Sequence, residues 1–432
     1  MSREQTIAAG GAPAYAWAPV TRRLGYDALF EAFAAGAAER DVKRTPIFAE
    51  TRRLLECGFG AVRLGPPAGA ERADRPDDPV RPEGGAGEGP LPLGEFFALV
   101  RDLAKADPNI AHVFRNHFFA VETHRRTPDD PFSARVLALA AGGAMFGVAF
   151  SEANGKPAGG QGHQPGMVLE PDGDGYRISG RKIYSTGNMY ADYLFATAVD
   201  GRSGEVRNLF VPTKAAGVRL DDDWDGFGQK LTGSGTTVFD RVAVGAGDLY
   251  RVPPRDETIP PLYGFTFHQI YLTTVISGIV ERILHDAVAV IRGRGRNYYH
   301  ALAEHPSQEP ELLSVIGRIA AHRAALVAVT ERASAALDRA WAGVDTDDAR
   351  ALSLAASIAA AEAKVVVDET AATLAGLLID VSSGSGVSTL RALDRHWRNI
   401  KVIAAHNPRV YKERILGDHY VNGALPPTGA FF

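Results

Sequence analysis

The chain has 432 residues, 45% of them apolar, which is enough to bury one large core or two to three smaller ones. The formal net charge is −4 and no run of Lys or Arg occurs, which argues against a nucleic-acid partner. The single cysteine, Cys57, excludes an intrachain disulfide and a cluster of metal-binding thiolates, and it fits a reducing cytoplasm. These properties favour a small-molecule partner.

The first part of the chain has a helical pattern. Apolar residues recur three and four apart in ALFEAFAAGAAERD and LGEFFALVRDLAKAD, so we predict an N-terminal helical domain over residues 1–143. Its start lacks a basic segment followed by an apolar one, and we expect no secretory signal. Residues 66–92 are rich in Pro, Gly and charge, which predicts a surface insertion. The glycines there do not form GxGxxG, so we reject a nucleotide-binding loop.

The middle of the chain has the pattern of a β module. Short apolar or alternating runs such as AMFGVAFSE, DYLFATAVD and GTTVFDRVAV are separated by turn residues, which predicts a β domain over residues 144–255. The sequence Asp172-Gly173-Asp174-Gly175 lies between two such runs and predicts a β-hairpin.

Long, alanine-rich helical periods follow, and they predict an antiparallel helical bundle with a closing tail over residues 256–432. Residues 262–280 carry no formal charge but include His268, Gln269 and several hydroxyl side chains. We therefore predict a buried helix with its preceding loop here, and no membrane span. The chain as a whole is predicted to be mainly α with a central β module.

Familiar catalytic motifs are missing from the sequence. Twelve histidines occur, but HExxH, CxxC and a carboxylate–histidine set at ligand spacing do not, so we predict no metal site. The sequence also lacks the GxSxG turn of a serine hydrolase and a Walker A loop.

Three polar segments are candidates for ligand binding. RKIYSTGNMYADY places Ser185 and Thr186 before Gly187, where hydroxyls and backbone N–H groups can approach a planar ligand. DGFGQKLTGSGTT has the same small, hydroxylated character, and for both segments an ordinary turn is an equally good interpretation. FRNHFFAVE places His117 among aromatic residues, where a core histidine is the simpler interpretation.

Taken together with LLECGFGAVRLGPP and the closing DRHWRNIKVIAAHNPRVYKERILGDHYVNG, these segments resemble the acyl-CoA dehydrogenase superfamily. Within it they resemble the flavin-dependent monooxygenase branch of dibenzothiophene monooxygenases and sulfur-acquisition oxidoreductases. The resemblance covers nearly the whole chain. It implies an N-terminal helical domain, a middle β-barrel or sandwich domain and a C-terminal helical bundle, in a homotetramer whose neighbouring subunit completes each cofactor site.

The resemblance also implies where a flavin binds, between the β module and the bundle. The residues that it assigns to the flavin ring are Phe150, Ser151, Tyr184, Ser185 and Thr186, and those of a second cofactor segment are Gln229, Lys230, Ser234 and Thr236. Arg296 matches an arginine that reaches the flavin phosphate of a neighbouring subunit. Arg292 and Arg294 are alternatives for that contact, and a solvated loop arginine is an equally good interpretation.

The closing segment separates two activities. A dehydrogenase of this superfamily uses a carboxylate as base, but the matching position falls on or beside His406-Asn407-Pro408, and Asn cannot accept a proton. The resemblance therefore favours a two-component monooxygenase, in which a separate flavin reductase supplies reduced FMN. FAD is the alternative cofactor. Dioxygen would form a C4a-hydroperoxyflavin that oxygenates a hydrophobic small molecule at S, N or aromatic C.

The resemblance gives catalytic roles to three residues. His117 and His406 flank the reacting edge of the flavin as hydrogen-bond donor and acid or base, and Ser185 bonds near the reactive ring nitrogen. Two other functions stay open, an FAD-dependent desaturase with an unconventional base and a non-catalytic relative that serves as a binding subunit.

Overall fold

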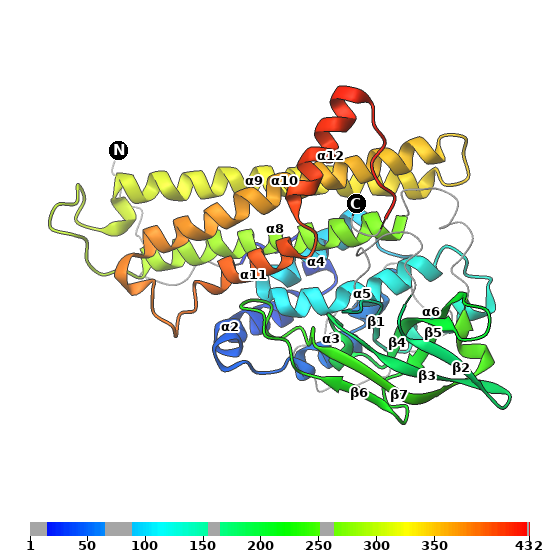
Figure 1. Cartoon of the computed structure of the whole chain (residues 1–432). Helices are drawn as coiled ribbons and strands as arrows, with labels where there is room; N and C mark the ends of the chain where they lie inside the picture. Colours follow the sequence, from blue (N-terminus) through cyan, green and yellow to red (C-terminus); the bar gives the residue numbers. More distant parts are fainter. Residues whose placement is uncertain (1–14, 65–88, 154–164, 251–262, 430–431) are drawn as a thin grey trace.

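The computed structural model describes residues 15–64, 89–153, 165–250, 263–429 and 432. Most of the predicted insertion at residues 66–92 lies outside the described residues. Figure 1 shows long helices along one side of the molecule, a β-sheet on the other and shorter helices between them. The prediction of a mainly α chain with a central β module is confirmed.

The N-terminal part is helical, as predicted. Its helices are α1 (Pro19–Arg23), α2 (Asp27–Lys43), α3 (Phe48–Glu56), α4 (Leu93–Ala106), α5 (Pro108–His124) and α6 (Pro131–Ala141), with a 3-10 turn η1 (Phe59–Ala61). An aspartate precedes α5 and another precedes α6. Asp107 and Asp130 each accept a backbone N–H from the first turn, and each is followed by proline. This combination fixes the start of a helix.

The middle part forms one sheet. Its strands are β1 (Phe146–Ala149), β2 (Val168–Asp172), β3 (Gly175–Lys182), β4 (Tyr193–Asp200), β5 (Val206–Pro212), β6 (Val218–Asp221), β7 (Thr236–Val244) and β8 (Leu249–Tyr250), with short turns η2 (Asn188–Tyr190) and η3 (Ala246–Asp248). The strand order is β6-β7-β3-β2-β4-β5-β8, and β1 pairs with β4. The predicted hairpin is confirmed, because Asp172 pairs with Gly175 and Gly173 has a left-handed φ of 61°.

The two faces of the sheet are buried in different ways. On one face, Phe146, Phe195 and Phe210 pack against Val121 of α5 and Val136 of α6. The other face forms a cluster of strand and loop residues that contains no residue of a described helix. Within the part of the chain that the structure describes, strands therefore bury strands on that face, as the predicted barrel or sandwich requires.

The C-terminal part is the predicted bundle. Its helices are α8 (Tyr263–Arg292), α9 (Pro310–Ala342), α10 (Ala349–Ser382), α11 (Arg395–Ala405) and α12 (Arg409–Asn422), with 3-10 turns η4 (Pro306–Gln308) and η5 (Ser383–Ser385). One hydrophobic core joins the bundle to the N-terminal helices, through contacts such as the stacked rings of Phe96 and Phe267. The uncharged stretch at residues 262–280 lies mostly in α8 and is largely buried there, as predicted.

Helix α9 has an exposed outer face. Of the described helices, it is the one long and apolar enough to cross a membrane, and 11% of its most apolar window is buried. Its inner face nevertheless packs in the bundle through Ile319, Leu326 and Leu337. The exposed outer face contains residues at spacings of three and four, namely Leu313, Gly317, Ala321, Ala324 and Ala328.

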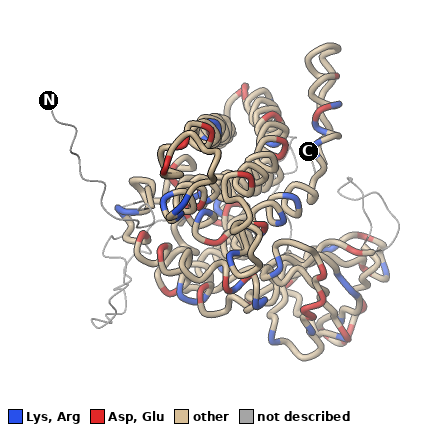
Figure 2. Tube along the Cα trace, turned by 90° about the vertical axis from the view of Figure 1, so that its left-hand side faces the viewer, with Lys and Arg blue, Asp and Glu red and all other residues tan. Residues whose placement is uncertain are grey.

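Acidic and basic residues are interspersed along the described chain (Figure 2).

A buried ion network attaches α11 to α8. Asp286 accepts hydrogen bonds from Arg282 at 2.6 Å, Arg395 at 3.2 Å and His396 at 2.8 Å. Burial alone would raise the pKa of the Asp286 carboxyl, but the arginines and histidines around it hold that pKa well below its usual value. His396 is thereby fixed as a packing residue of the helix that precedes His406.

We expect Asp286→Ala to lower the free energy of unfolding by about 3–5 kcal/mol, because it leaves buried cations without their carboxylate. The exposed Asp380 of α10 offers a matched control, and Asp380→Ala should have little effect. The pKa of Asp286 is lower in the folded protein than in the unfolded chain. Its contribution to the free energy of unfolding should therefore be fully present above the unfolded-state pKa and be lost as the pH falls through the folded-state pKa. Urea unfolding at neutral pH and at pH 3 measures both effects. Equal stability of the two variants at neutral pH would contradict this role.

Candidate functional site

The predicted ligand-binding segments meet where the strands end. The backbone N–H of Ile183 donates to Ser151 O at 2.9 Å, which joins the end of β1 to the end of β3. Ser185 N donates to Gly235 O at 3.1 Å, and the hydroxyls of Thr186 and Ser234 lie 2.8 Å apart. The sequence predicted these segments separately, and the tertiary structure brings them together.

Several polar atoms at this meeting point have unused hydrogen-bonding capacity. Ser185 is 2% exposed and Gln229 is 1% exposed. Ser185 Oγ and Gln229 Nε2 have no hydrogen-bond partner in the described part of the molecule, and the same holds for Asn116 Oδ1. Buried polar groups in proteins are generally paired. Unpaired atoms grouped in this way indicate a place for a polar ligand.

The loop that carries Gln229 is held from two sides. Gln229 N donates to Asn399 Oδ1 of α11 at 2.7 Å, and Leu231 N donates to Asn109 Oδ1 of α5 at 3.3 Å. Gly228 lies so close to α11 that an added Cβ would be 2.3 Å from Arg398 O. The loop thus connects the sheet, the N-terminal helices and the closing helix.

Helix α5 presents a polar face toward α8 and the closing segment. His112 and Arg115 are three residues apart and share one side of the helix. His112 Nδ1 lies 2.9 Å from Gln229 Oε1, and Arg115 Nη1 lies 3.1 Å from His406 Nε2. His268 of α8 contributes a third imidazole to this group, with its ring 4.2 Å from that of Phe119. We call these four residues the Arg115 cluster: His112, Arg115, His268 and His406.

The electrostatics of the Arg115 cluster make its histidines neutral. Burial, followed by the charge of Arg115, lowers the pKa of His112 to about 3. The same two causes, burial first and then the charge of Arg115, lower the pKa values of His268 and His406 well below the usual range. The His406 ring is surrounded by protein even though part of its side chain is exposed to solvent. Burial lowers the pKa of Arg115 to about 10, so this side chain keeps its charge at neutral pH.

The hydrogen bonds also fix the tautomers of two rings. Arginine has only donors, so His406 Nε2 accepts from Arg115 and the neutral His406 ring carries its proton on Nδ1. An amide oxygen only accepts, so His112 Nδ1 donates to Gln229, and His112 Nε2 is an acceptor without a partner among the described residues. His406 is therefore suited to donate a hydrogen bond, whereas its lone pair is already engaged.

His117 lies on the other side of α5. Two residues along a helix correspond to about 200°, so His117 points away from Arg115. Its Nε2 donates to Gly60 O at 2.8 Å, its ring stacks on Phe146, and burial lowers its pKa to about 4. The structure brings His406, but not His117, to the Arg115 cluster, and the catalytic role of His117 stays a prediction.

The remaining predicted residues have different surroundings. Phe150 packs beside the aromatic cluster of the sheet, Tyr184 is 65% exposed, and Lys230 lies 3.8 Å from Asp41. Thr236 is bound through its backbone N–H and its hydroxyl to Asp223, both at 2.7 Å.

Arg296 is exposed in the loop after α8, at the end of the bundle away from the sheet (Figure 1). A rise of about 1.5 Å per residue places the end of α8 about 36 Å from His268. Arg296 therefore lies far from the Arg115 cluster of its own chain.

Sequence reasoning missed His112, Arg115, His268 and Asn399 as site residues. Arg115 stands two positions before His117 in FRNHFF, but its contact with His406 spans 291 residues. No local sequence pattern indicates such a contact.

Among the described residues, no group of three His, Cys, Asp or Glu side chains has the geometry for a metal ion.

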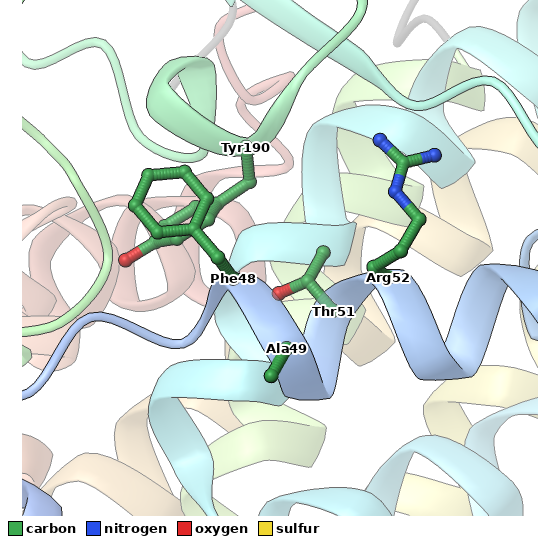
Figure 3. Close-up of a pocket in the computed structure, with 5 residues that line it drawn as sticks. All are labelled: Phe48, Ala49, Thr51, Arg52 and Tyr190. Atoms are coloured by element: carbon green, nitrogen blue, oxygen red, sulfur yellow. The ribbon is translucent and has the colours of Figure 1, made fainter.

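A surface depression of about 330 Å³ lies between α3 and η2, lined by Phe48, Ala49, Thr51, Arg52 and Tyr190. Figure 3 shows the Phe48 ring beside that of Tyr190, and their centroids are 4.8 Å apart. None of the lining residues belongs to the predicted site or to the Arg115 cluster, so this depression is not the candidate site.

Comparison with known proteins extends these observations. Residues 270–409 match the family described as "Acyl-CoA dehydrogenase, C-terminal domain". The chain is 26% identical to a probable FMNH2-dependent monooxygenase, SfnC, of Pseudomonas putida, over 91% of this chain and 93% of that protein.

Two solved structures are similar over nearly the whole chain. The first is methanesulfinate monooxygenase MsuC of Pseudomonas fluorescens, with 26% identity, a TM-score of 0.77 and coverage of 96% of this chain and 100% of that one. The second is FMN-bound TdsC of Paenibacillus sp. A11-2, with 22% identity, a TM-score of 0.81 and the same coverage.

The chain has the acyl-CoA dehydrogenase fold. The resemblance to the flavin-dependent monooxygenase branch of that superfamily, predicted from the sequence, is confirmed by these comparisons. In this acyl-CoA dehydrogenase fold, the Arg115 cluster lies where α5, α8 and the closing segment meet, and the unpaired Ser185 and Gln229 atoms lie where the sheet joins them.

We expect Gly228→Ala to separate the loop at residues 222–235 from α11, because the new Cβ would overlap backbone atoms of Arg398. Amide hydrogen exchange in this loop should rise, and the melting temperature should fall. Gly247→Ala is the control, because a Cβ there meets nothing within 4 Å. Unchanged exchange in Gly228→Ala would show that the loop does not depend on this contact.

Proposed function

We propose that this protein is the oxygenase component of a two-component FMN-dependent monooxygenase that acts on small sulfur compounds. The observation that carries the proposal is the set of buried, unpaired polar atoms between the sheet and the Arg115 cluster, in a chain with this fold. The names of the relatives, SfnC and methanesulfinate monooxygenase, support FMN and a sulfur substrate. A nitrogen atom or an aromatic carbon is the alternative site of oxygenation.

The residues present fit a flavin. Its ring needs hydrogen bonds at the edge and apolar contacts on the faces. Ser185 Oγ and Gln229 Nε2 have unused capacity for the ring edge, and Thr186 and Ser234 add hydroxyls beside them. We assign the ring to these residues with Phe150, Ser151 and Tyr184, and we assign Lys230 and Thr236 to positions further along the same cofactor. Bound reduced FMN, with dioxygen, supplies one oxygen atom to the substrate while the other leaves as water.

The chain's own contribution is to orient groups and exclude water. We assign to His406 the role of hydrogen-bond donor through Nδ1, because Arg115 holds its Nε2. We assign to Ser185 a bond to the flavin ring, and to His117 a supporting role within the aromatic wall of Phe114, Phe118 and Phe146. A water-poor wall of this kind limits the unproductive release of hydrogen peroxide.

The desaturase alternative is less well supported. It requires a carboxylate base beside the ligand. Among the described residues no carboxylate forms an ion pair with Arg115, and Asn399, in the closing segment, is engaged with Gln229 N.

We further propose a homotetramer in which neighbouring subunits cover the outer face of α9. The residues of that face are small and apolar, which permits close helix approach. Arg296, too distant to reach the cofactor of its own chain, would then bind the FMN phosphate of a neighbour. We place the reaction in the cytoplasm, where a reductase can supply the reduced flavin.

The proposal is tested with purified protein, a flavin reductase, NADH, FMN and ¹⁸O₂, using methanesulfinate and dibenzothiophene as substrates. We expect a product that contains one ¹⁸O atom. His406→Ala should bind FMN normally but form about 100-fold less product, with a matching rise in hydrogen peroxide. His419→Ala is the control, because His419 binds Ala424 O of the tail. If the unaltered protein consumes oxygen but forms only hydrogen peroxide with every substrate, the proposed activity is contradicted.

The assignment of Arg296 is tested by FMN titration and by light scattering. Arg296→Gln should raise the FMN dissociation constant about 10- to 100-fold, because a charge-assisted bond to phosphate is lost, while the tetrameric mass is kept. Arg292→Gln is the matched control, four residues earlier at the end of α8. If only the control weakens FMN binding, the phosphate contact belongs to Arg292, and a monomeric mass for the unaltered protein would remove the basis for either contact.

A further inference from the structure

Arg115 is a buried cation that has no counter-ion among the residues described by the structure. The residue is 5% exposed, and no carboxylate of the described residues forms an ion pair with it. Its single hydrogen bond runs from Nη1 to the neutral His406 ring, and its Nε has no partner within the described structure. Other buried arginines in this protein are paired, as Arg63 is with Glu122 and Arg395 with Asp286. A buried charge is costly unless it is paired, so Arg115 calls for an anion that the described chain does not itself supply.

The surroundings of Arg115 are arranged for such an anion. Gln229 Nε2 is an unpaired donor, and His268 Nε2 is a further ring nitrogen without a partner in the described structure. Gln229, in the loop before β7, contacts His112 one turn before Arg115 on α5, and His268 of α8 is close enough to Arg115 for its pKa to be lowered by that charge. Because burial, and after it the positive charge of Arg115, lowers the pKa values of the neighbouring imidazoles and keeps them neutral, the Arg115 cluster has a single net charge.

The Arg115 cluster is also accessible and has an apolar side. His406, in contact with Arg115, is exposed to solvent, so the cluster borders solvent on that side. Phe119 lies against His268 with ring centroids 4.2 Å apart and offers an apolar surface beside the charge.

We propose that Arg115 binds the anionic head group of the substrate, so that the substrate is a small organic acid carrying a carboxylate or a sulfur oxyanion. The guanidinium fork can offer two parallel N–H bonds to two oxygens of one head group. An N–H of the Gln229 amide and an N–H of the neutral His268 ring complete the contacts, and the apolar body of the substrate lies toward Phe119. This inference rests on the proposed monooxygenase function and narrows its substrate from a hydrophobic molecule to an anionic one.

The test uses calorimetry on the flavin-free protein, so that it does not depend on oxygenation. Methanesulfinate and benzenesulfinate are compared with their neutral, similarly pyramidal analogues dimethyl sulfoxide and methyl phenyl sulfoxide, and benzoate probes the carboxylate. We expect the anions to bind at least 10-fold more tightly than the neutral analogues. Benzoate binding as tight as that of benzenesulfinate would indicate carboxylates as substrates, and weaker binding would indicate sulfur oxyanions.

Substitutions separate a binding role from a structural one. Arg115→Gln should weaken anion binding about 10- to 100-fold, and Arg115→Lys should keep part of it. Arg115→Met should abolish the preference for anions without lowering the melting temperature, because it removes a charge that has no counter-ion among the described residues. Arg135→Gln is the control, since Arg135 lies on the surface and pairs with Asp248.

Three results would overturn the proposal. The first is that the unaltered protein binds sulfinates and sulfoxides equally tightly. The second is that Arg115→Met and Arg115→Gln both have a much lower melting temperature. The third is that FMN and the sulfinates compete for binding. The last result would mean that Arg115 serves the flavin. If the protein binds anions tightly through Arg115 but never oxygenates a substrate, the anion site is upheld and only the proposed monooxygenase function is refuted.

Discussion

The candidate site depends on the placement of one residue, Gln229, which links three parts of the chain. Its backbone N–H is held by Asn399 of α11, and its side-chain oxygen is held by His112 of α5. Its own loop runs directly into β7 of the sheet. The sheet, the N-terminal helices and the closing segment are therefore fixed relative to one another at the point where the polar atoms gather. Attachment of α11 to α8 through Asp286 supports this geometry one turn earlier in the same helix.

The second constraint is electrostatic. One guanidinium without a carboxylate partner among the described residues lies among three imidazoles, and burial, reinforced by its charge, keeps all three neutral. This arrangement does not maximise stability, because a buried charge without a partner opposes folding. Proteins accept such costs where a ligand supplies the missing group. The N–H that Arg115 donates to His406 Nε2 places the proton of the neutral His406 ring on Nδ1, so the residue proposed to hold the anion also determines which hydrogen bond its neighbour can donate.

The proposed assembly follows from distances within one subunit. The cluster lies near the start of α8, whereas Arg296 follows the end of that helix (Figure 1). A helix of this length keeps the two apart, so a shared cofactor site requires a second copy. The small, exposed residues of α9 run beside α8 and α10 and would bring another bundle close.

Sequence patterns by themselves determined the helices, the strands, the hairpin at Gly173 and the order of the three parts, because these depend on local spacing and turn chemistry. Motifs also determined the family resemblance and placed Ser185, Gln229 and His406 among the candidate residues. Only the tertiary structure decided which side chains meet. It joined His406 to Arg115 across 291 residues, turned His117 to the opposite side of the same helix and left Arg115 without a carboxylate partner in the described part of the chain. Contacts between distant segments depend on how whole elements pack, and no local pattern encodes that packing.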